Sequence, residues 1–202
     1  MNNTARILIF TGDGKGKTTA ALGMAFRAAG HGLRSCVIQF VKADDTVGEV
    51  TAAAGPGLIE IHQTGRGFLP PAGDPRWETH RAAAQNGLRM AAEAVDSGRY
   101  RLVVLDEICF AVARGLIDEG QVRDLVAQAH SRQVLPSPPA PLPQAGEGSS
   151  KLVAQSSPET CLVLTGRGAT PGLVALADTV TEMRCVKHGF QAGWPAQEGV
   201  ER

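Results

Sequence analysis

The chain lacks features that would place it in several large classes of protein. Aromatic residues make up only 4% of its 202 residues, and 20 lysines and arginines are balanced by 20 aspartates and glutamates. A neutral chain with few aromatics offers neither the positive charge that attracts phosphate backbones nor the rings on which bases stack. The sequence therefore predicts a protein that does not bind nucleic acid.

Long apolar runs are also missing. No stretch approaches the roughly 18 apolar residues that a membrane-spanning helix needs, and the first apolar run, residues 7–10, is too short for a secretory signal. The cysteines are widely spaced and form no Cys-x-x-Cys pair, which argues against a zinc site. They are Cys36, Cys109, Cys161 and Cys185. We expect reduced thiols, no membrane contact and a cytoplasmic location.

Apolar runs typical of buried strands alternate with segments of helical periodicity. In the first expected helix Leu22, Ala25, Phe26 and Ala29 share one face, which we expect to be buried. Strands separated by helices predict a single α/β domain in which helices cover both faces of a parallel sheet. The expected strands are residues 7–10, 35–41, 59–63, 102–106, 160–165 and 180–186, and the expected helices are residues 17–29, 77–96, 118–130 and 171–177.

Residues 136–150 interrupt this alternation, because ten of these fifteen residues are Pro, Gly or Ser. Such a composition has no apolar periodicity and buries little apolar surface. We predict a disordered insertion over about residues 133–158, at a surface connection where extra chain is tolerated. A proline-rich docking motif is the alternative.

The strongest functional signal is the glycine-rich loop after the first strand, Thr11-Gly12-Asp13-Gly14-Lys15-Gly16-Lys17-Thr18-Thr19. Glycines let backbone N–H groups surround an anion at the start of a helix. Lys17 adds a charge, and the Thr18 hydroxyl is suited to Mg²⁺. Thr11 stands where the usual G-x-x-x-x-G-K-[ST] pattern has its first glycine. We therefore predict nucleoside triphosphate binding in an unusual pose, rather than a turn without a ligand.

Two further strand ends carry polar residues. The run 102–105 leads into Asp106 and Glu107, where a carboxylate would hold Mg²⁺ opposite Thr18. Glu107 is either a general base or a member of the metal shell, and a plain solvated strand end is the alternative. Arg167, in a Gly-flanked turn after another strand, is placed to bind phosphate oxygens unless it is simply solvated.

Two glycine-containing loops carry less specific signals. Phe68, in the loop 65–71, is either a lid over a flat substrate or a plug of the core. His188, in the block 186–193, is more typical of a structural hydrogen-bonding residue than of a ligand. Trp77 is expected to pack at the start of its helix.

Together these motifs resemble the P-loop-type corrinoid adenosyltransferases, which act on cob(I)alamin and cob(I)yrinic acid a,c-diamide. The resemblance implies a P-loop NTPase-like (RecA-like) sheet and a cytoplasmic enzyme of adenosylcobalamin biosynthesis or salvage. It implies transfer of the 5′-deoxyadenosyl group of ATP to Co(I) of a reduced corrinoid, with release of triphosphate. The nucleotide would lie reversed in the loop, in agreement with the shortened spacing. The matching segments are residues 10–21, 37–40, 103–107, 164–168, 177–188 and 196–201.

The resemblance also implies roles for individual residues, a homodimer, and a flavoprotein-like reductase that supplies electrons. Lys17, Thr18, Glu107 and Arg167 would be catalytic. The nucleotide and corrinoid would be bound by Gly12, Asp13, Gly14, Lys15, Gly16, Lys17, Thr18, Thr19, Arg27, Arg167, Phe68 and His188. Mg²⁺ (or Mn²⁺) would be held by Thr18, Asp106 and Glu107.

The chain departs from the family pattern at two places. Pro70 stands where an aromatic residue often follows Phe68, and only five residues precede Arg6, where family members commonly carry a longer helix. Two other classes of function stay open at this point. A generic P-loop ATPase or small-molecule kinase would release ADP, and a non-catalytic corrinoid- or nucleotide-binding protein would bind without turnover.

Overall fold

The computed structural model describes residues 5–44, 46–53, 57–71, 73–131 and 160–200. Its six strands form one parallel sheet in the order β3-β2-β4-β5-β1-β6. The strands are β1 (Ile7–Thr11), β2 (Ser35–Gln39), β3 (Ile59–Gln63), β4 (Leu102–Asp106), β5 (Cys161–Thr165) and β6 (Thr179–Glu182). The helices are α1 (Lys17–Gly30), α2 (Gly48–Ala53), α3 (Trp77–Asp96), α4 (Ile108–Ala113), α5 (Glu119–Ser131) and α6 (Pro171–Leu176), with a short 3-10 helix at Gly189–Ala192. The predicted insertion, residues 133–158, lies outside the described residues.

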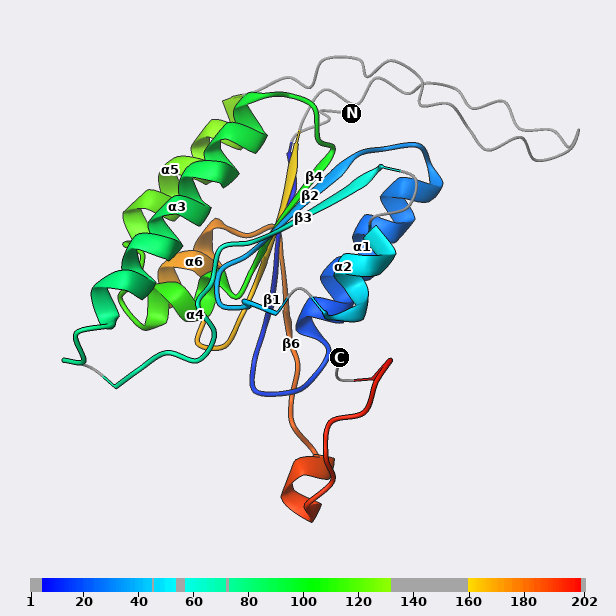
Figure 1. The fold of residues 1–202 in the computed structure, drawn as a ribbon. Helices are drawn as coiled ribbons and strands as arrows, with labels where there is room; N and C mark the ends of the chain where they lie inside the picture. The colour runs from blue at the N-terminus through cyan, green and yellow to red at the C-terminus, as the bar shows by residue number, and fades with distance from the viewer. Residues whose placement is uncertain (1–4, 45, 54–56, 72, 132–159, 201–202) are drawn as a thin grey trace, which may run out of the picture.

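Helices cover both faces of the sheet (Figure 1), as the sequence predicts. α1 and α2 lie on one face, and α3 to α6 lie on the other. Neighbouring residues of one strand enter the two separate cores: Val104 packs toward α1, while Val103 and Leu105 pack toward α3 and α5. Strands buried on both sides need apolar residues at every position, which explains their continuous apolar runs. None of the described helices is long and apolar enough to cross a membrane.

The buried face of α1 differs from the predicted one. Ala21 and Ala25 are completely buried against the sheet, whereas Phe26 is 54% exposed. Leu22 and Ala29 pack only at the margin of this core. Two alanines at i and i+4 let the helix approach the sheet closely. The prediction was wrong for Phe26. Apolar periodicity identifies a broad apolar stripe on the helix, but it does not show which edge of the stripe touches the sheet.

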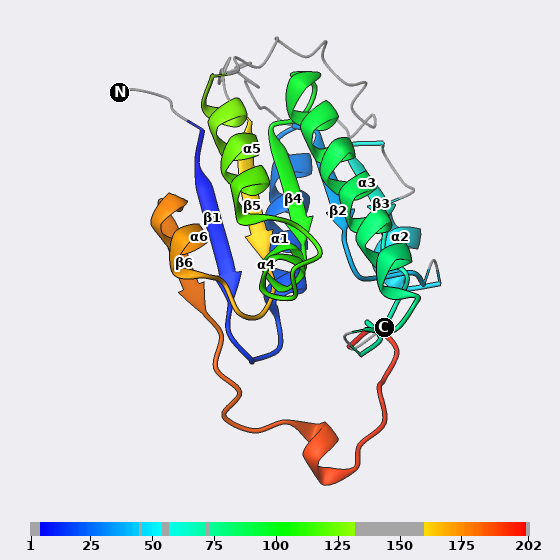
Figure 2. The ribbon, with the colours of Figure 1, turned by 90° about the vertical axis from the view of Figure 1, so that its left-hand side faces the viewer.

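Two strands are shorter than predicted. β2 ends at Gln39 rather than at residue 41, and β6 ends at Glu182 rather than at residue 186. β6 is an edge strand whose pairing with β1 stops at the pair Thr11–Glu182, where β1 itself ends. Beyond this point the chain runs beneath the carboxyl ends of the strands (Figure 2, orange to red). The six-residue helices α2 and α4 were not predicted, because they are too short to show periodicity.

The order of the central strands determines where the site lies. β5 separates β1 from β4, so the loop after β1 and the carboxylates after β4 lie one strand apart. All strands run in the same direction, so their carboxyl ends meet at one edge of the sheet (Figure 2). Ligands of open α/β sheets bind at this edge.

Candidate active site

The loop of residues 12–16, which joins β1 to α1, is shaped by close backbone contacts. Gly12 and Gly16 have φ values of +90° and +111°, a region that favours glycine. The Gly14 N–H donates to the main-chain oxygen of Met183 over 2.7 Å. A Cβ added at Gly12 would lie 2.4 Å from that same oxygen. The segment after β6 therefore supports the loop and leaves no room for larger residues.

The ammonium group of Lys17 lies inside this loop. Its Nζ donates to the main-chain oxygens of Gly12 over 2.8 Å and Gly14 over 2.6 Å, and the residue is only 7% exposed. Burial lowers the pKa of Lys17, while the negative charge of Glu107 acts in the opposite direction. The loop thus holds the Lys17 ammonium group at a place where it would pair with the phosphates of a nucleotide.

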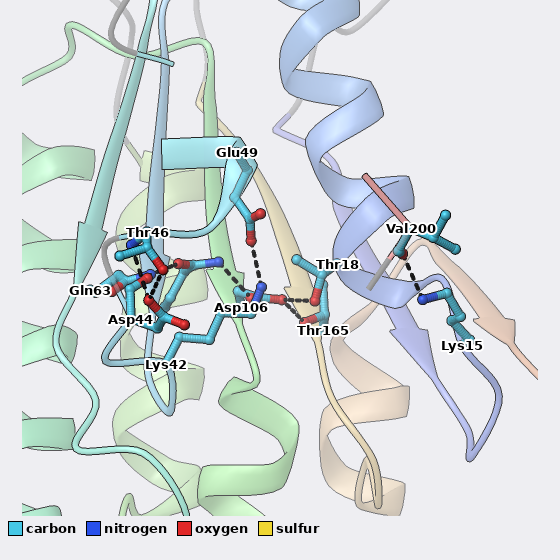
Figure 3. A network of polar contacts seen from close by, with 11 residues as sticks. Lys15, Thr18, Lys42, Asp44, Thr46, Glu49, Gln63, Asp106, Thr165 and Val200 are labelled. Atoms are coloured by element: carbon cyan, nitrogen blue, oxygen red, sulfur yellow. Dashed lines mark hydrogen bonds and ion pairs between the residues drawn. The ribbon is translucent and has the colours of Figure 1, made fainter. Parts of the chain in front are cut away.

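The carboxylate of Asp106 is the centre of a buried hydrogen-bond network (Figure 3). Thr18 Oγ1 and Thr165 Oγ1 donate to its Oδ1 over 2.8 and 2.7 Å. Gln39 Nε2 donates to its Oδ2 over 3.2 Å. Asp106 is 1% exposed, and these three partners are all neutral. Three neutral donors therefore fix the orientation of this carboxyl group, whose oxygens are the kind of ligand that Mg²⁺ prefers.

Glu107 combines an unusual backbone with a perturbed side chain. Its φ of +66° is the only positive value for a non-glycine residue in the described part of the chain. Its N–H donates to Thr165 Oγ1 over 2.9 Å. Burial, and then the neighbouring charge of Asp106, raise the pKa of the Glu107 carboxyl. Backbone strain and a shifted pKa at one residue are typical of functional sites.

Thr18, Asp106 and Glu107 fit a magnesium site that a substrate completes. Mg²⁺ prefers hard oxygen ligands and is usually bound through one or two carboxylates together with substrate phosphates. Within the described ranges, no group of three or more His, Cys, Asp or Glu residues could hold a metal ion. The donor set therefore matches Mg²⁺ that is shared with a nucleotide, rather than a cage made by the protein alone.

Several other predicted residues surround the loop. Asp13 and Lys15 are exposed on it, and Thr19 is exposed in the first turn of α1. Arg167 Nη1 lies 3.9 Å from the Asp13 carboxylate. Lys15 Nζ donates to the main-chain oxygen of Val200 over 2.8 Å, which ties the last described residues to the loop (Figure 3). Next to them, Lys15 and half-buried His188 line a hollow of about 400 Å³.

The structure does not bring Arg27 to the phosphate loop. Arg27 lies in the last turn of α1, ten positions after Lys17, which corresponds to about 15 Å along the helix axis. With Arg6 and Arg101 it lines a separate, mainly apolar hollow beside the amino ends of the strands. Within one chain, therefore, Arg27 lies at the opposite edge of the sheet from the loop.

Phe68 and Trp77 lie in different environments. Phe68, in the loop after β3, is fully exposed at 101%, so the core-plug interpretation is wrong. Trp77 begins α3 and packs against the core, as predicted.

Sequence reasoning missed the glutamines that complete the network around Asp106. Gln63 Nε2 donates to Gln39 Oε1 over 2.9 Å and to the main-chain oxygen of Asp44 over 2.8 Å. Thr165 was noted only as part of a motif. One signal was available: β2, β3 and β5 each end in a polar residue at the edge where ligands bind.

A comparison with family sequence models identifies the family. The model described as ATP:corrinoid adenosyltransferase BtuR/CobO/CobP matches residues 3–135 and 147–202. The chain belongs to the ATP:corrinoid adenosyltransferase family. The resemblance that the motifs indicate is therefore confirmed, and the enzyme belongs to a family of transferases whose substrates are ATP and a corrinoid. The unmatched residues 136–146 fall within the predicted insertion.

Curated relatives agree with this assignment. Corrinoid adenosyltransferases from Pseudomonas aeruginosa and Salmonella typhimurium are each 35% identical to the chain. Both alignments cover 96% of this chain, with 82% and 84% of the relatives. The Escherichia coli corrinoid adenosyltransferase is 32% identical, over 96% of this chain and 84% of its own.

A solved structure supports the fold. A KaiC-like protein from Pyrococcus horikoshii OT3 superimposes with a TM-score of 0.50 and 17% identity, over 90% of this chain and 71% of that protein. At this identity the likeness concerns the fold alone. It agrees with the predicted P-loop NTPase-like (RecA-like) parallel sheet.

Proposed function

We propose that the enzyme transfers the 5′-deoxyadenosyl group of ATP to the Co(I) centre of a reduced corrinoid, either cobalamin or cobyrinic acid a,c-diamide. The electron pair of Co(I) attacks the 5′-carbon of the ribose and forms the cobalt–carbon bond. The bond between this carbon and the phosphate oxygen breaks, and inorganic triphosphate leaves with its electron pair. The reaction serves the synthesis or salvage of adenosylcobalamin.

One observation carries this proposal beyond family membership. The Thr18 hydroxyl and the Asp106 carboxylate meet at 2.8 Å beside a loop that encloses the Lys17 ammonium group. This arrangement supports the proposal that a phosphate cradle lies beside a site for a divalent cation. Such a site suits a reaction in which a triphosphate must be bound and its charge neutralised.

In this proposal the protein supplies binding and electrostatics, because Co(I) is itself a strong nucleophile. Lys17 leaves the carbonyls of Gly12 and Gly14 and pairs with phosphate oxygens. Arg167 lies across the loop from Asp13 and contacts the same triphosphate. Positive groups that already face the leaving group stabilise the charge that grows on it.

Mg²⁺ held by Thr18, Asp106 and Glu107 would neutralise charge on the bound phosphates. Glu107 serves here as part of the metal shell rather than as a base, because the reaction removes no proton. Its backbone strain is consistent with a side chain held in a required orientation.

Phe68 is the residue that we propose to face the corrinoid. A fully exposed phenylalanine on a loop is an apolar surface without a partner in the described chain. Packing against a flat macrocycle would bury it and exclude water from the reacting cobalt. The nucleotide, in the reversed orientation, would present its ribose toward this loop.

The remaining parts of the proposal rest on the family resemblance alone. They are a homodimer, a separate flavoprotein-like reductase that converts Co(II) to Co(I), and a cytoplasmic location. In a dimer, Arg27 would reach a nucleotide only in the partner's site.

The test is incubation of the purified protein with MgATP and chemically reduced cob(I)alamin, without oxygen and in the dark. The cobalt spectrum and the release of triphosphate are followed together. Light-sensitive adenosylcobalamin with equimolar triphosphate is the expected result, and Lys17→Ala should abolish it. ADP release without corrinoid would instead indicate an ATPase or kinase, and tight binding without turnover a non-catalytic protein.

A further inference from the structure

Gln39 is a buried amide whose position needs an explanation. It lies at the end of β2 with 0% exposure, beside strands whose buried side chains are mainly apolar. Burying an amide group is unfavourable unless its hydrogen bonds are satisfied. If packing were its only role, an apolar residue of similar volume would be at least as stable.

Both ends of the Gln39 amide are engaged. Nε2 donates to Asp106 Oδ2 over 3.2 Å, and Oε1 accepts from Gln63 Nε2 over 2.9 Å. Thr18 and Thr165 hold the other carboxylate oxygen, so Gln39 completes the fixation of Asp106. As a neutral donor it orients the carboxylate without cancelling its charge, which a lysine or arginine would do.

Gln63 determines which way the Gln39 amide faces. Its two N–H groups go to Gln39 Oε1 and to the main-chain oxygen of Asp44, over 2.9 and 2.8 Å. Because the Gln63 amide donates to Gln39, the amide oxygen of Gln39 must face Gln63. The amide nitrogen of Gln39 then faces Asp106. Figure 3 shows Gln63 and Asp106 apart from each other, joined by the hydrogen bonds that run between them.

The same residues support the base of the Phe68 loop. The main-chain oxygen of Gln39 accepts from the N–H groups of Thr64 and Gly65 over 3.0 and 3.3 Å. The Gly67 N–H donates to the oxygen of Val41 over 2.9 Å. A Cβ added at Gly65 would lie 2.1 Å from the main chain of Val41, so the two segments are in tight contact.

We propose that Gln39 and Gln63 form a positioning pair, which orients the Asp106 carboxylate toward the cation and couples it to the loop that carries Phe68. The inference rests on the proposed function, because it takes Asp106 as a ligand of Mg²⁺ and Phe68 as the residue facing the corrinoid. The nucleotide and corrinoid sides of the site are then linked through two side-chain amides.

The test compares two substitutions with a matched control. Gln39→Met and Gln63→Met keep the length of the side chain and remove its amide group. Because Gln63 is only half-buried, Gln63→Met should disturb folding less than Gln39→Met. The control is Gln85→Met. Gln85 also donates to another glutamine, Gln121, and to a main-chain oxygen, that of Leu116, but it does so away from the site.

The affinity for ATP is measured by calorimetry on the full chain, with Mg²⁺ and with a chelator. The two site variants should weaken ATP binding about 10-fold with Mg²⁺, as is usual when residues behind metal ligands are lost. Binding without Mg²⁺ should not change, and Gln85→Met should match the wild type in both. MgATP should also slow amide exchange of residues 64–67 in the wild type but not in Gln63→Met.

Two results would overturn the proposal, and they are distinguishable. Unchanged Mg²⁺-dependent affinity in both site variants would exclude a positioning role and leave the proposed function intact. If the wild type itself bound ATP equally well with and without Mg²⁺, the metal site of the proposed function would fail, and the positioning role with it.

Discussion

Thr18 and Asp106 are joined side chain to side chain over 2.8 Å, although 88 positions separate them in the sequence. Thr18 belongs to the first turn of α1 and Asp106 ends β4, with β5 lying between β1 and β4 in the sheet. The end of β5 supplies Thr165 to the same carboxylate oxygen. The proposed cation site therefore combines the start of α1 with the ends of β4 and β5, all at one edge of the sheet.

Removing the Thr18 hydroxyl should impair catalysis more than folding. We expect Thr18→Val to lower kcat/KM for ATP by about 10- to 100-fold, because an oxygen donor of the cation site is lost. The change in unfolding free energy should stay within about 1 kcal/mol, the usual contribution of one hydrogen bond. Turnover at several Mg²⁺ concentrations and urea unfolding measure the two effects. Thr79→Val, at an exposed position of α3, is the control and should alter neither.

Glu107→Gln should make the protein more stable at neutral pH while it impairs catalysis. The folded protein holds the Glu107 proton more tightly than the unfolded chain does, because its pKa is raised above 4.5. This contribution to stability is present at low pH and is lost as the pH rises through the folded-state pKa. Glutamine carries no charge and avoids this loss, so Tm should rise by a few degrees at neutral pH. The gain should disappear near pH 4.5 in thermal scans, and a gain of equal size at all pH values would contradict this explanation.

Two glycine-to-alanine substitutions near the start of α1 should have opposite effects. Gly12→Ala places a Cβ 2.4 Å from the Met183 oxygen at a φ of +90°, so the loop must distort and ATP binding should be lost. At Gly23, inside α1, an added Cβ meets nothing within 4 Å. Gly23→Ala should stabilise the protein by about 0.5–1 kcal/mol through helix propensity. Calorimetric ATP titration and thermal unfolding distinguish these outcomes, and similar behaviour of the two variants would refute the role given to the Met183 segment.

Phe68→Ala should affect the corrinoid and not the fold. Phe68 is fully exposed, so its loss should change the unfolding free energy by less than about 0.5 kcal/mol. KM for the corrinoid should rise while KM for ATP stays the same. The matched control is Phe26→Ala, which removes another exposed phenylalanine from the outer side of α1. An equal effect of both substitutions on the corrinoid would argue against contact with Phe68.

The cysteines should differ widely in reactivity. Burial raises the pKa of the Cys36 and Cys109 thiols to about 12, so neither forms the reactive thiolate in the folded protein. Cys185 is exposed and Cys161 is partly buried. Titration of the native protein with a thiol reagent should give one fast equivalent, which Cys185→Ser removes. A fast equivalent that remains in that variant would show that a thiol other than Cys185 is accessible in the folded protein.

The sequence indicates those parts of the candidate site whose residues are adjacent in the chain. The loop through Lys17 and Thr18, and the strand that ends in Asp106, were recognised because each motif is contiguous. Gln39 was noted only as part of the segment 37–40, because the role of a buried glutamine at a strand end depends on partners from other strands. The support that Met183 gives to the loop was equally invisible. It depends on a contact between residues more than 160 positions apart, which no local pattern records.

The contact between the glycine loop and the segment after β6 has a consequence for the order in which the protein is made. The loop is translated well before β6, and translation adds roughly 5–20 residues per second. The backbone on which Gly12 and Gly14 rest comes only after the last strand of the sheet. In a nascent chain the nucleotide-binding motif is therefore made long before its support, and it takes its final shape only after β6 and the segment that follows it have left the ribosome.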